Sequence, residues 1–168
     1  YFDAGEITMS WKDIIKNMDK DKFETHAFDL GRYGKHNQPI SEFKDRFDFW
    51  YELNDRSNQE IINIIQKNNI EILFDVMSIT HPERIGIFNN RVSPLQISWL
   101  AYCNTVGSDK IDYLIADNNL IKDIEEKYYA EKIIKLSNIW STHSGFDLNR
   151  VCQESPLLKN KYITFGSF

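Results

Sequence analysis

The sequence has 168 residues, of which 42% are hydrophobic and 14% aromatic, and its formal net charge is −5. This composition excludes a disordered chain and predicts one domain with a hydrophobic core. No apolar run reaches the roughly 18 residues of a membrane-spanning helix, and the acidic balance disfavours nucleic acid, so we expect neither membrane nor nucleic acid as a partner.

The first third of the sequence alternates helical and extended patterns. Apolar residues recur at helical spacing over Ser10–Met18 and predict a short amphipathic helix. The alternating stretch Phe23–Phe28 predicts a strand, and the polar stretch 31–40 predicts a loop. A short helix over Ser41–Phe47 and a short strand over Phe49–Leu53 are expected to follow.

The clearest local signal is a capping box at Ser57 and Glu60, in which the Ser hydroxyl accepts a backbone N–H and the Glu side chain reaches back. It predicts a helix that continues through a row of isoleucines and ends at Asn68-Asn69. The nearly continuous apolar stretch Ile70–Met77 then predicts a buried parallel strand.

Extended and helical patterns keep alternating in the second half of the sequence. Strands are predicted over Leu95–Ala101, Asp112–Ala116 and Glu131–Leu136, and a helix over Ile121–Tyr129. This alternation predicts an α/β fold, with a Rossmann-like parallel sheet flanked by helices on both faces.

The pattern divides the chain into three segments. Residues 1–140 are predicted to form the Rossmann-like domain, and residues 141–161, which lack a clear period, a linker or an irregular lobe. The apolar run 162–168 predicts the first strand of a second, truncated domain. Because the sequence starts with Tyr and ends inside this run, we expect an excised segment of a longer polypeptide.

Binding sites in such folds lie at the carboxyl ends of the strands, which are here residues 77–80, 101–107 and 116–117. Backbone N–H groups and the Thr105 hydroxyl in the loop 101–107 suit a phosphate or a sugar, although an ordinary polar connection explains the same residues.

Four more polar side chains lie in or after the predicted strand Ile70–Met77. Asp75 lies in an apolar strand and either shapes a site or is structural. His81 is predicted to be a solvated loop histidine. Arg84 and Arg91 either neutralise a phosphate or form ion pairs with a nearby Asp.

The cysteines and histidines predict no metal or redox chemistry. Cys103 and Cys152 are far apart and match no ligand spacing, which favours free thiols in a reducing compartment. The histidines also lack metal-ligand spacing, so we expect no metal site. The first residues have neither the basic start nor the apolar run of a secretory signal, which together with the thiols predicts a cytoplasmic location.

Four ordered segments carry a resemblance to a known family. Asp75–Phe88 is similar to the pattern D-L-x-G-[HY]-T-x-x-x-R-x-x-[IL]-F, and Arg91–Gly107 to R-P-A-P-I-Q-x-x-[WY]-L-G-Y-P-G-T-[ST]-G. Asp112–Asp117 is similar to D-Y-x-[IV]-x-D, and Tyr129–Ile133 to Y-x-E-K-[IL]. As a set they resemble the catalytic region of O-linked N-acetylglucosamine transferases, including the SPINDLY-type proteins, with the likeness strongest over residues 70–136.

The resemblance implies the N-terminal half of a GT-B glycosyltransferase, in which two Rossmann-like domains hold a nucleotide sugar between them. It implies transfer of N-acetylglucosamine from UDP-N-acetylglucosamine (UDP-GlcNAc) to Ser or Thr hydroxyls of an acceptor protein, with inversion and without a metal or another cofactor. The implied partners within the parent chain are a C-terminal catalytic domain and tetratricopeptide repeats. The family's first strand would precede Tyr1, and the segment alone is expected to be inactive. The alternative is a diverged, non-catalytic module that serves protein interaction.

Matched position by position, the resemblance implies that substrate-binding residues are Thr80, Arg84, Ala101, Tyr102, Asn104 and Thr105, and it assigns no catalytic residue. Ile79, Cys103 and Asn104 depart from the family's pattern, which has His or Tyr, Pro and Gly there. Asn adopts left-handed backbone more readily than most residues, so we expect that conformation at Asn104.

Overall fold

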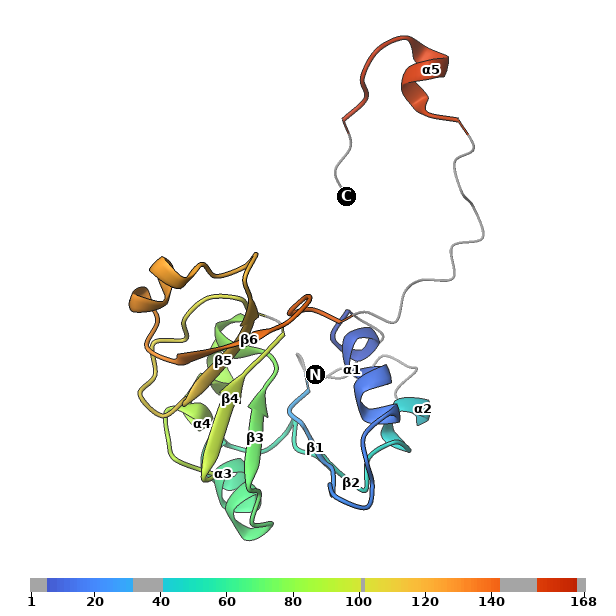
Figure 1. The fold of residues 1–168 in the computed structure, drawn as a ribbon. Helices are drawn as coiled ribbons and strands as arrows, with labels where there is room; N and C mark the ends of the chain where they lie inside the picture. Colours follow the sequence, from blue (N-terminus) through green and yellow to red (C-terminus); the bar gives the residue numbers. More distant parts are fainter. Residues whose placement is uncertain (1–5, 32–40, 101, 143–153, 166–168) are drawn as a thin grey trace.

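The computed structural model describes residues 6–31, 41–100, 102–142 and 154–165. Its six strands form two parallel sheets (Figure 1). The smaller sheet pairs two strands, and the larger has four strands in the order β3-β4-β5-β6. The strands are β1 (His26–Asp29), β2 (Phe49–Glu52), β3 (Ile72–Asp75), β4 (Leu95–Ser98), β5 (Tyr113–Asp117) and β6 (Lys132–Leu136). The predicted α/β fold with a parallel sheet is confirmed.

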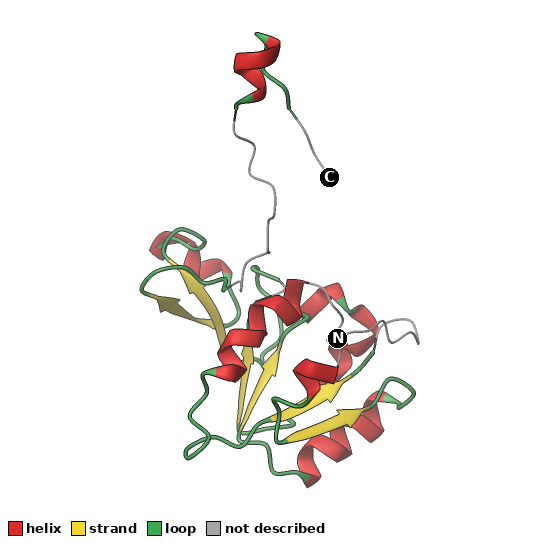
Figure 2. Ribbon diagram, turned by 90° about the vertical axis from the view of Figure 1, so that its right-hand side faces the viewer, coloured by secondary structure: helices red, strands yellow, loops and turns green. Residues whose placement is uncertain are grey.

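Helices lie against both faces of the strands, as the side view shows (Figure 2). The α-helices are α1 (Glu6–Lys16), α2 (Ser41–Lys44), α3 (Asn58–Lys67), α4 (Ile85–Phe88) and α5 (Pro156–Asn160). Three short 3₁₀ helices complete the described elements, namely η1 (Ser78–Thr80), η2 (Pro82–Arg84) and η3 (Asp123–Tyr128).

Helix α3 begins as its sequence predicts. The Ser57 side chain accepts a hydrogen bond from the backbone N–H of Glu60, and the Glu60 carboxylate accepts one from the backbone N–H of Ser57. The capping box therefore satisfies two donors that the start of a helix otherwise leaves free.

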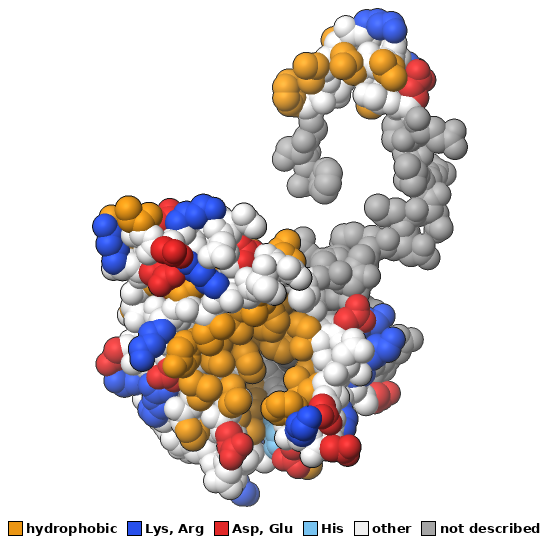
Figure 3. Space-filling model, in the orientation of Figure 1, with side chains coloured by type: hydrophobic (Ala, Val, Ile, Leu, Met, Phe, Trp, Pro, Cys, Tyr) orange, Lys and Arg blue, Asp and Glu red, His pale blue; other side chains and the backbone are white. Residues whose placement is uncertain are grey.

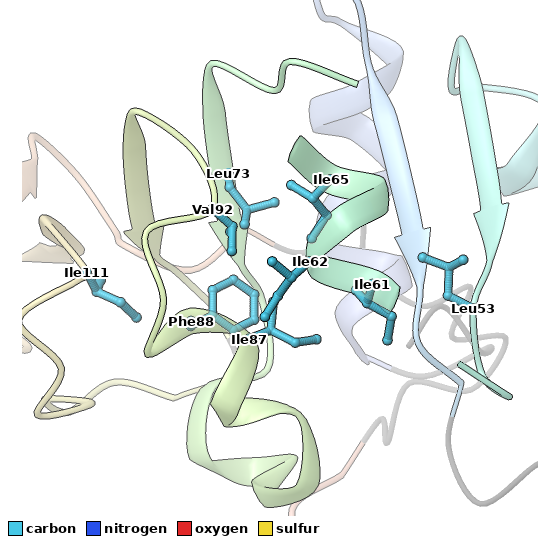
Figure 4. Packing of buried hydrophobic residues seen from close by; sticks show 9 residues of the cluster. All are labelled: Leu53, Ile61, Ile62, Ile65, Leu73, Ile87, Phe88, Val92 and Ile111. Atoms are coloured by element: carbon cyan, nitrogen blue, oxygen red, sulfur yellow. The ribbon is translucent and has the colours of Figure 1, made fainter. Parts of the chain in front are cut away.

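The hydrophobic core has a separate cluster on each face of the strands. On one face, α3 and α4 pack against β3 (Figure 4), and the cluster comprises Leu53, Ile61, Ile62, Ile65, Leu73, Ile87, Phe88, Val92 and Ile111. On the other face, α1 contributes Trp11 and Ile15 to a cluster that includes Phe74 of β3. Leu73 and Phe74 are neighbours in one strand, and successive strand residues point to opposite faces.

Both long helices contact both sheets. The α3 cluster takes in Phe28 and Tyr51 of the small sheet as well as Leu73 of the large one. The α1 cluster likewise contains Trp50 of β2 and Phe74 of β3. Burial under α1 and α3 therefore joins the two sheets.

Two predicted elements differ from the structure. The α-helix predicted over Ile121–Tyr129 is the 3₁₀ helix η3, and only Ile121 of its predicted apolar face is buried, whereas Ile124 is 74% exposed. The reason is that Ile121 packs against β5 before the helix begins.

In the predicted final strand, residues 162–165 form no strand, and residues 166–168 lie outside the described residues. The predicted linker contains α5, and every residue from 154 to 165 is exposed.

Candidate functional site

A groove of about 740 Å³ separates the two sheets. Its side walls are β1 and β3, and its top and bottom are Trp11 and Ile15 of α1 and Ile61 and Ile65 of α3. Figure 3 shows hydrophobic side chains gathered around the resulting hollow. Phe23 and Ile72 line the groove and are 50% and 44% exposed, so large apolar surface is left open there.

The groove becomes polar at the carboxyl end of β3. One carboxylate oxygen of Asp75, Oδ1, accepts hydrogen bonds from the backbone N–H groups of Met77 and Ser78, at 3.0 and 2.7 Å. The other oxygen is buried without a partner in the described part of the chain, as are the Ser78 hydroxyl and the Trp11 indole N–H. Burial raises the pKa of Asp75, against the effect of the two N–H donors.

Ser78 adds strain to this polar end, because its φ of 51° lies in the left-handed region that favours glycine. Asp75 and Ser78 are each only 3% exposed. The two hydrogen bonds that Asp75 accepts from the backbone N–H groups of Met77 and Ser78 hold the sharp turn in place. Asp75 therefore has a clear structural role, and its second oxygen remains available to a donor that enters the groove.

Asp is the last residue of three strands, and each time its carboxylate binds the turn beyond the strand. Asp29 accepts the backbone N–H of Gly31 at 3.0 Å. Asp117 accepts the N–H groups of Asn119 and Leu120 through one oxygen and that of Trp140, at 2.7 Å, through the other. The Trp140 and Leu120 hydrogen bonds lower the pKa of Asp117. Asp117 is thus fully engaged, in contrast to Asp75.

Thr80 and Arg84 lie in the turns after β3, and both bind backbone groups of the protein itself. The exposed Thr80 hydroxyl donates to the carbonyl of Met77. The Arg84 guanidinium donates to the carbonyls of Asn54 and Arg56, at 2.9 and 2.8 Å, and to the Asn58 side chain at 3.0 Å. It therefore fastens the turn to the connection between β2 and α3.

The loop 102–107 is organised by Glu131, which the sequence patterns did not single out as a site residue. Glu131 is only 4% exposed and accepts the Thr105 hydroxyl at 2.7 Å and the backbone N–H of Val106 at 2.8 Å. The Thr105 oxygen in turn accepts the N–H groups of Gly107 and Ala130. The signal was present, because Glu131 is the acidic residue of the Y-x-E-K-[IL] match.

These contacts place two of the predicted substrate-binding residues, Thr80 and Thr105, at opposite edges of the sheet. Thr80 follows the carboxyl end of β3, whereas Thr105 binds Glu131, which directly precedes the amino end of β6. The expectation that the whole loop lies at the carboxyl ends was therefore wrong, because the connection from β4 must return to the amino end of β5. Tyr102 is half-buried and Asn104 exposed, while Ala101 lies outside the described residues.

Two local expectations are also corrected. His81 is 6% exposed, because the turns after β3 fold it against the groove, where burial lowers its pKa. Its Nε2 lies 3.1 Å from a Glu83 oxygen. Asn104 has no positive φ, whereas Leu100, earlier in the same connection, has a φ of 103°.

Of the two roles predicted for Arg91, phosphate neutralisation and an ion pair with an Asp, the structure shows the ion pair. The Arg91 guanidinium binds both oxygens of Asp112, at 2.5 and 2.9 Å. This bidentate hydrogen bonding raises the pKa of Arg91 and lowers that of Asp112. Asp112 also accepts the backbone N–H of Gln96 at 2.9 Å, so the pair fixes the start of β4 beside β5.

Neither a metal cluster nor a membrane span is found among the described residues. In residues 6–31, 41–100, 102–142 and 154–165, no group of three His, Cys, Asp or Glu side chains is arranged to hold a metal ion. Over the same ranges, no helix is long and apolar enough to cross a membrane. Cys103 is a free, exposed thiol, and Cys152 lies outside these ranges.

Comparison with known proteins yields one family and a consistent set of relatives. The model of the family "Glycosyl transferase family 41" matches residues 12–146. A protein of Petunia hybrida named "Probable UDP-N-acetylglucosamine--peptide N-acetylglucosaminyltransferase SPINDLY" is 24% identical over 119 residues, which are 71% of this chain and 13% of that protein. The corresponding protein of Arabidopsis thaliana is 26% identical over 120 residues, with the same coverage. A second protein of Arabidopsis thaliana, named "Probable UDP-N-acetylglucosamine--peptide N-acetylglucosaminyltransferase SEC", is 30% identical over 84 residues, which are 50% of this chain and 9% of that protein.

The fold has a counterpart among solved structures. A mutant O-GlcNAc transferase of Thermobaculum terrenum superposes with a TM-score of 0.78 over 83% of this chain and 26% of that one, at 21% identity. The chain thus shares a fold with part of a longer protein, and it spans about one-eighth of the length of the Petunia relative.

Proposed function

The chain belongs to glycosyl transferase family 41, and on that premise we propose that it forms the N-terminal, Rossmann-like half of a GT-B catalytic unit. The match of the family model over residues 12–146 is the observation that carries this proposal. The parallel strands and the likeness of the fold to part of an O-GlcNAc transferase support it.

The reaction we propose is transfer of N-acetylglucosamine from UDP-GlcNAc to Ser or Thr hydroxyls of a protein. The names of the plant relatives support this donor and a peptide acceptor. We further propose that transfer inverts the sugar carbon and needs no metal. In that case Arg and Lys side chains, backbone N–H groups and helix amino ends of a C-terminal catalytic domain stabilise the leaving diphosphate.

This half is proposed to supply the sugar and acceptor side of the cleft. Thr80 and Asn104 are exposed and Tyr102 is half-buried, so a substrate can reach them. Arg84 and Thr105 are assigned positioning roles, because their polar groups already form hydrogen bonds with other groups of this chain. Ala101 is retained in the proposed set on its place in the family pattern.

The parent protein is proposed to act in the cytoplasm, with tetratricopeptide repeats that hold the acceptor. These two points rest on the resemblance of the sequence and on the spacing of its two cysteines, which matches no metal or redox motif. They are separate from the proposed chemistry, and cell fractionation of the tagged parent protein tests the location.

A donor screen on the full-length parent protein tests the proposed reaction. We expect calorimetry to show binding of UDP-GlcNAc in preference to GDP-fucose, and incubation with UDP-GlcNAc to release UDP and label an acceptor protein. The 168-residue chain alone is expected to show no turnover, because it supplies one side of the cleft.

Two outcomes would contradict this assignment. A parent protein that folds but binds no nucleotide sugar would favour the non-catalytic interaction module instead. Transfer catalysed by the 168-residue chain alone would show that the second half is not needed.

A further inference from the structure

We propose that Ile79 and Thr80 recognise the acetamido group of the transferred sugar and so determine which donor this half of the cleft accepts. Ile79 would contact the acetamido methyl group, and the Thr80 hydroxyl oxygen would accept the amide N–H. This role rests on the proposed function, because it requires a nucleotide sugar at the carboxyl end of β3, where both residues lie.

The turn that carries both residues is held by hydrogen bonds within the chain. The Asp75 carboxylate accepts the backbone N–H groups of Met77 and Ser78, at 3.0 and 2.7 Å, and the Met77 carbonyl accepts the backbone N–H of Thr80 at 3.2 Å. Arg84, in the next turn, donates to two carbonyls of the connection before α3. The side chains of the turn are therefore presented in a fixed arrangement, which lowers the entropic cost of binding a ligand.

Ile79 exposes apolar surface on this fixed turn. Its side chain is 42% exposed, whereas the preceding Ser78 is 3% exposed and its hydroxyl is buried without a partner in the described part of the chain. The turn therefore buries a hydroxyl and exposes an isoleucine, which is the reverse of what solvation favours. Ser78 also has a φ of 51°, in the left-handed region. Departures of this kind from local rules are typical of binding sites.

Thr80 offers a ligand an acceptor and no donor. Its hydroxyl donates to the carbonyl of Met77, so the hydroxyl proton is already in use. The remaining lone pairs of the oxygen can only accept a hydrogen bond. The exposed Thr80 side chain therefore suits an N–H or O–H group of a bound molecule and does not suit a carbonyl or phosphate oxygen.

The acetamido group of N-acetylglucosamine matches this pair of side chains. It carries the one methyl group and the one N–H of the sugar. In a planar trans amide the N–H lies opposite the carbonyl oxygen, on the same edge as the methyl group. That edge presents an apolar group beside a donor, and the consecutive residues Ile79 and Thr80 present an apolar group beside an acceptor. Glucose has a hydroxyl in place of the acetamido group and therefore has no methyl group for Ile79.

Ile79 also sets this chain apart from the family pattern, which has His or Tyr at the same position. Both of those side chains carry a hydrogen-bonding group at the tip, whereas isoleucine carries none. The apolar contact to the donor is therefore a property of this chain and does not follow from the pattern.

Calorimetry on the full-length parent protein tests this role with three probes, UDP-GlcNAc, UDP-glucose and UDP. The parent should bind UDP-GlcNAc more tightly than UDP-glucose. In Ile79→Ser the ratio of these two affinities should fall about fivefold or more, because a methyl contact in an apolar pocket is worth about 10–200-fold and this one is open on one side. Ile79→Leu keeps the apolar volume and should retain the ratio. The affinity for UDP, which has no sugar to recognise at this position, should stay the same.

Substitutions of Thr80 test the acceptor, and Ile139 provides the control. Thr80→Val removes the oxygen at nearly constant volume and should lower the ratio, whereas Thr80→Ser keeps the oxygen and should not. Ile139→Ser is the matched control, since Ile139 is 62% exposed and follows β6 instead of β3, and it should leave the ratio unchanged. Urea denaturation checks that each variant is folded, and Ile79→Thr replaces Ile79→Ser if the latter is not.

Recognition of the acetamido group and the proposed transfer fail in different ways. A parent that binds UDP-GlcNAc no better than UDP-glucose, or a ratio that Ile79→Ser leaves unchanged, rejects the role of Ile79 and leaves the proposed transfer standing. Equal losses of affinity for all three probes in Ile79→Ser reject it too, because they show a general disturbance of the cleft. A folded parent that binds none of the probes overturns the proposed function, and the recognition of the acetamido group with it.

Discussion

Asp75 and Asp117 show how one residue type, at the same place in two strands, meets opposite electrostatic conditions. Both end a strand and accept backbone N–H groups from the next turn. Asp117 has a third N–H donor, from Trp140, on its second oxygen, and its pKa is lowered. Asp75 lacks a donor there among the described residues, and burial raises its pKa. The charge of Asp75 therefore opposes folding of this chain, and the charge of Asp117 favours it.

This contrast predicts the effect of Asp75→Asn in the 168-residue chain. A raised native pKa means that stability is lost as the pH rises above the unfolded value of 3.8. The Asn oxygen can still accept the Met77 and Ser78 N–H groups while the buried charge is gone. Urea denaturation should therefore show the variant to be more stable than the parent at neutral pH, and the difference should vanish below pH 3.8.

Asp117→Asn is the matched control, and its effect has the opposite sign. A lowered native pKa stabilises the fold above the unfolded value of 3.8, and this stability is lost as the pH falls. The control should destabilise the chain at neutral pH. An Asp75→Asn variant that is less stable than the parent at neutral pH would reveal a donor to the second oxygen.

The sequence predicted residue types better than residue roles. Arg84 and Arg91 carried the same two interpretations, and only the folded chain shows which acceptors surround each one. His81 looked solvated because a Pro comes directly after it, yet the turns after β3 bury it against the groove. The acceptors of Arg84 and Arg91 lie far away in sequence, and local patterns do not reveal such partners.

At the scale of elements, the loop 102–107 depends on one buried acceptor. Glu131 binds the Thr105 hydroxyl and the N–H groups of Val106 and Gly107. It precedes β6 directly, so the loop and the strand are positioned together. A loop without helix or strand of its own is thereby held in one conformation.

Glu131→Gln should loosen this loop. The amide group replaces an acceptor oxygen by a donor, which leaves a buried N–H or hydroxyl unpaired, and such losses cost about 1–3 kcal/mol. Denaturation of the purified variant gives the change in the free energy of unfolding. Asn104→Ala, on the same loop but exposed, should stay within about 0.5 kcal/mol of the parent. Equal stabilities of Glu131→Gln and Asn104→Ala would show that Glu131 does not hold the loop.

Elements with signals inside their own sequence were predicted well. The capping box and isoleucine row of α3 lie within a dozen residues, and the helix starts where they indicate. The segment Ile121–Tyr129 has helical spacing too. However, Ile121 packs into the hydrophobic cluster on β5, while Ile124 and Tyr128 of the same predicted face are exposed to solvent. Spacing alone could not show which face has something to pack against.

At the scale of the molecule, α1 and α3 hold two sheets together without hydrogen bonds between the described strands of one sheet and those of the other. Trp11 has a central place in this arrangement, since its ring lies edge-on to both Phe74 and Trp99, with centroids 5.6 and 5.3 Å away. Its cluster also reaches Trp50 of the small sheet. Loss of this side chain removes contacts to both sheets at once.

Trp11→Ala should therefore destabilise the whole chain by about 3–5 kcal/mol, the usual cost of removing a buried large aromatic side chain. Hydrogen exchange should become faster in β1 and in β3 together. Ile124→Ala is the control, because Ile124 is 74% exposed and its loss should be nearly neutral. Faster exchange confined to one sheet would show that α1 does not couple the two.

The α/β fold could be predicted because helical and extended periods are local and their alternation is visible along the sequence. The division into two sheets could not, because pairing joins strands that are distant in sequence, such as Ile72 with Leu95. The separation of Thr80 from Thr105 has the same origin, since the path of the connection after β4 depends on Glu131 far along the chain.

The walls of the groove have a consequence for synthesis on the ribosome. β1 ends at Asp29, whereas β3 begins only at Ile72, and chains grow by about 5–20 residues per second. The second wall therefore emerges seconds after the first. Until β3 appears, the apolar side chains of α1 and β1 that line the groove remain without their second wall. Nascent chains of this protein should depend on chaperone protection during that interval.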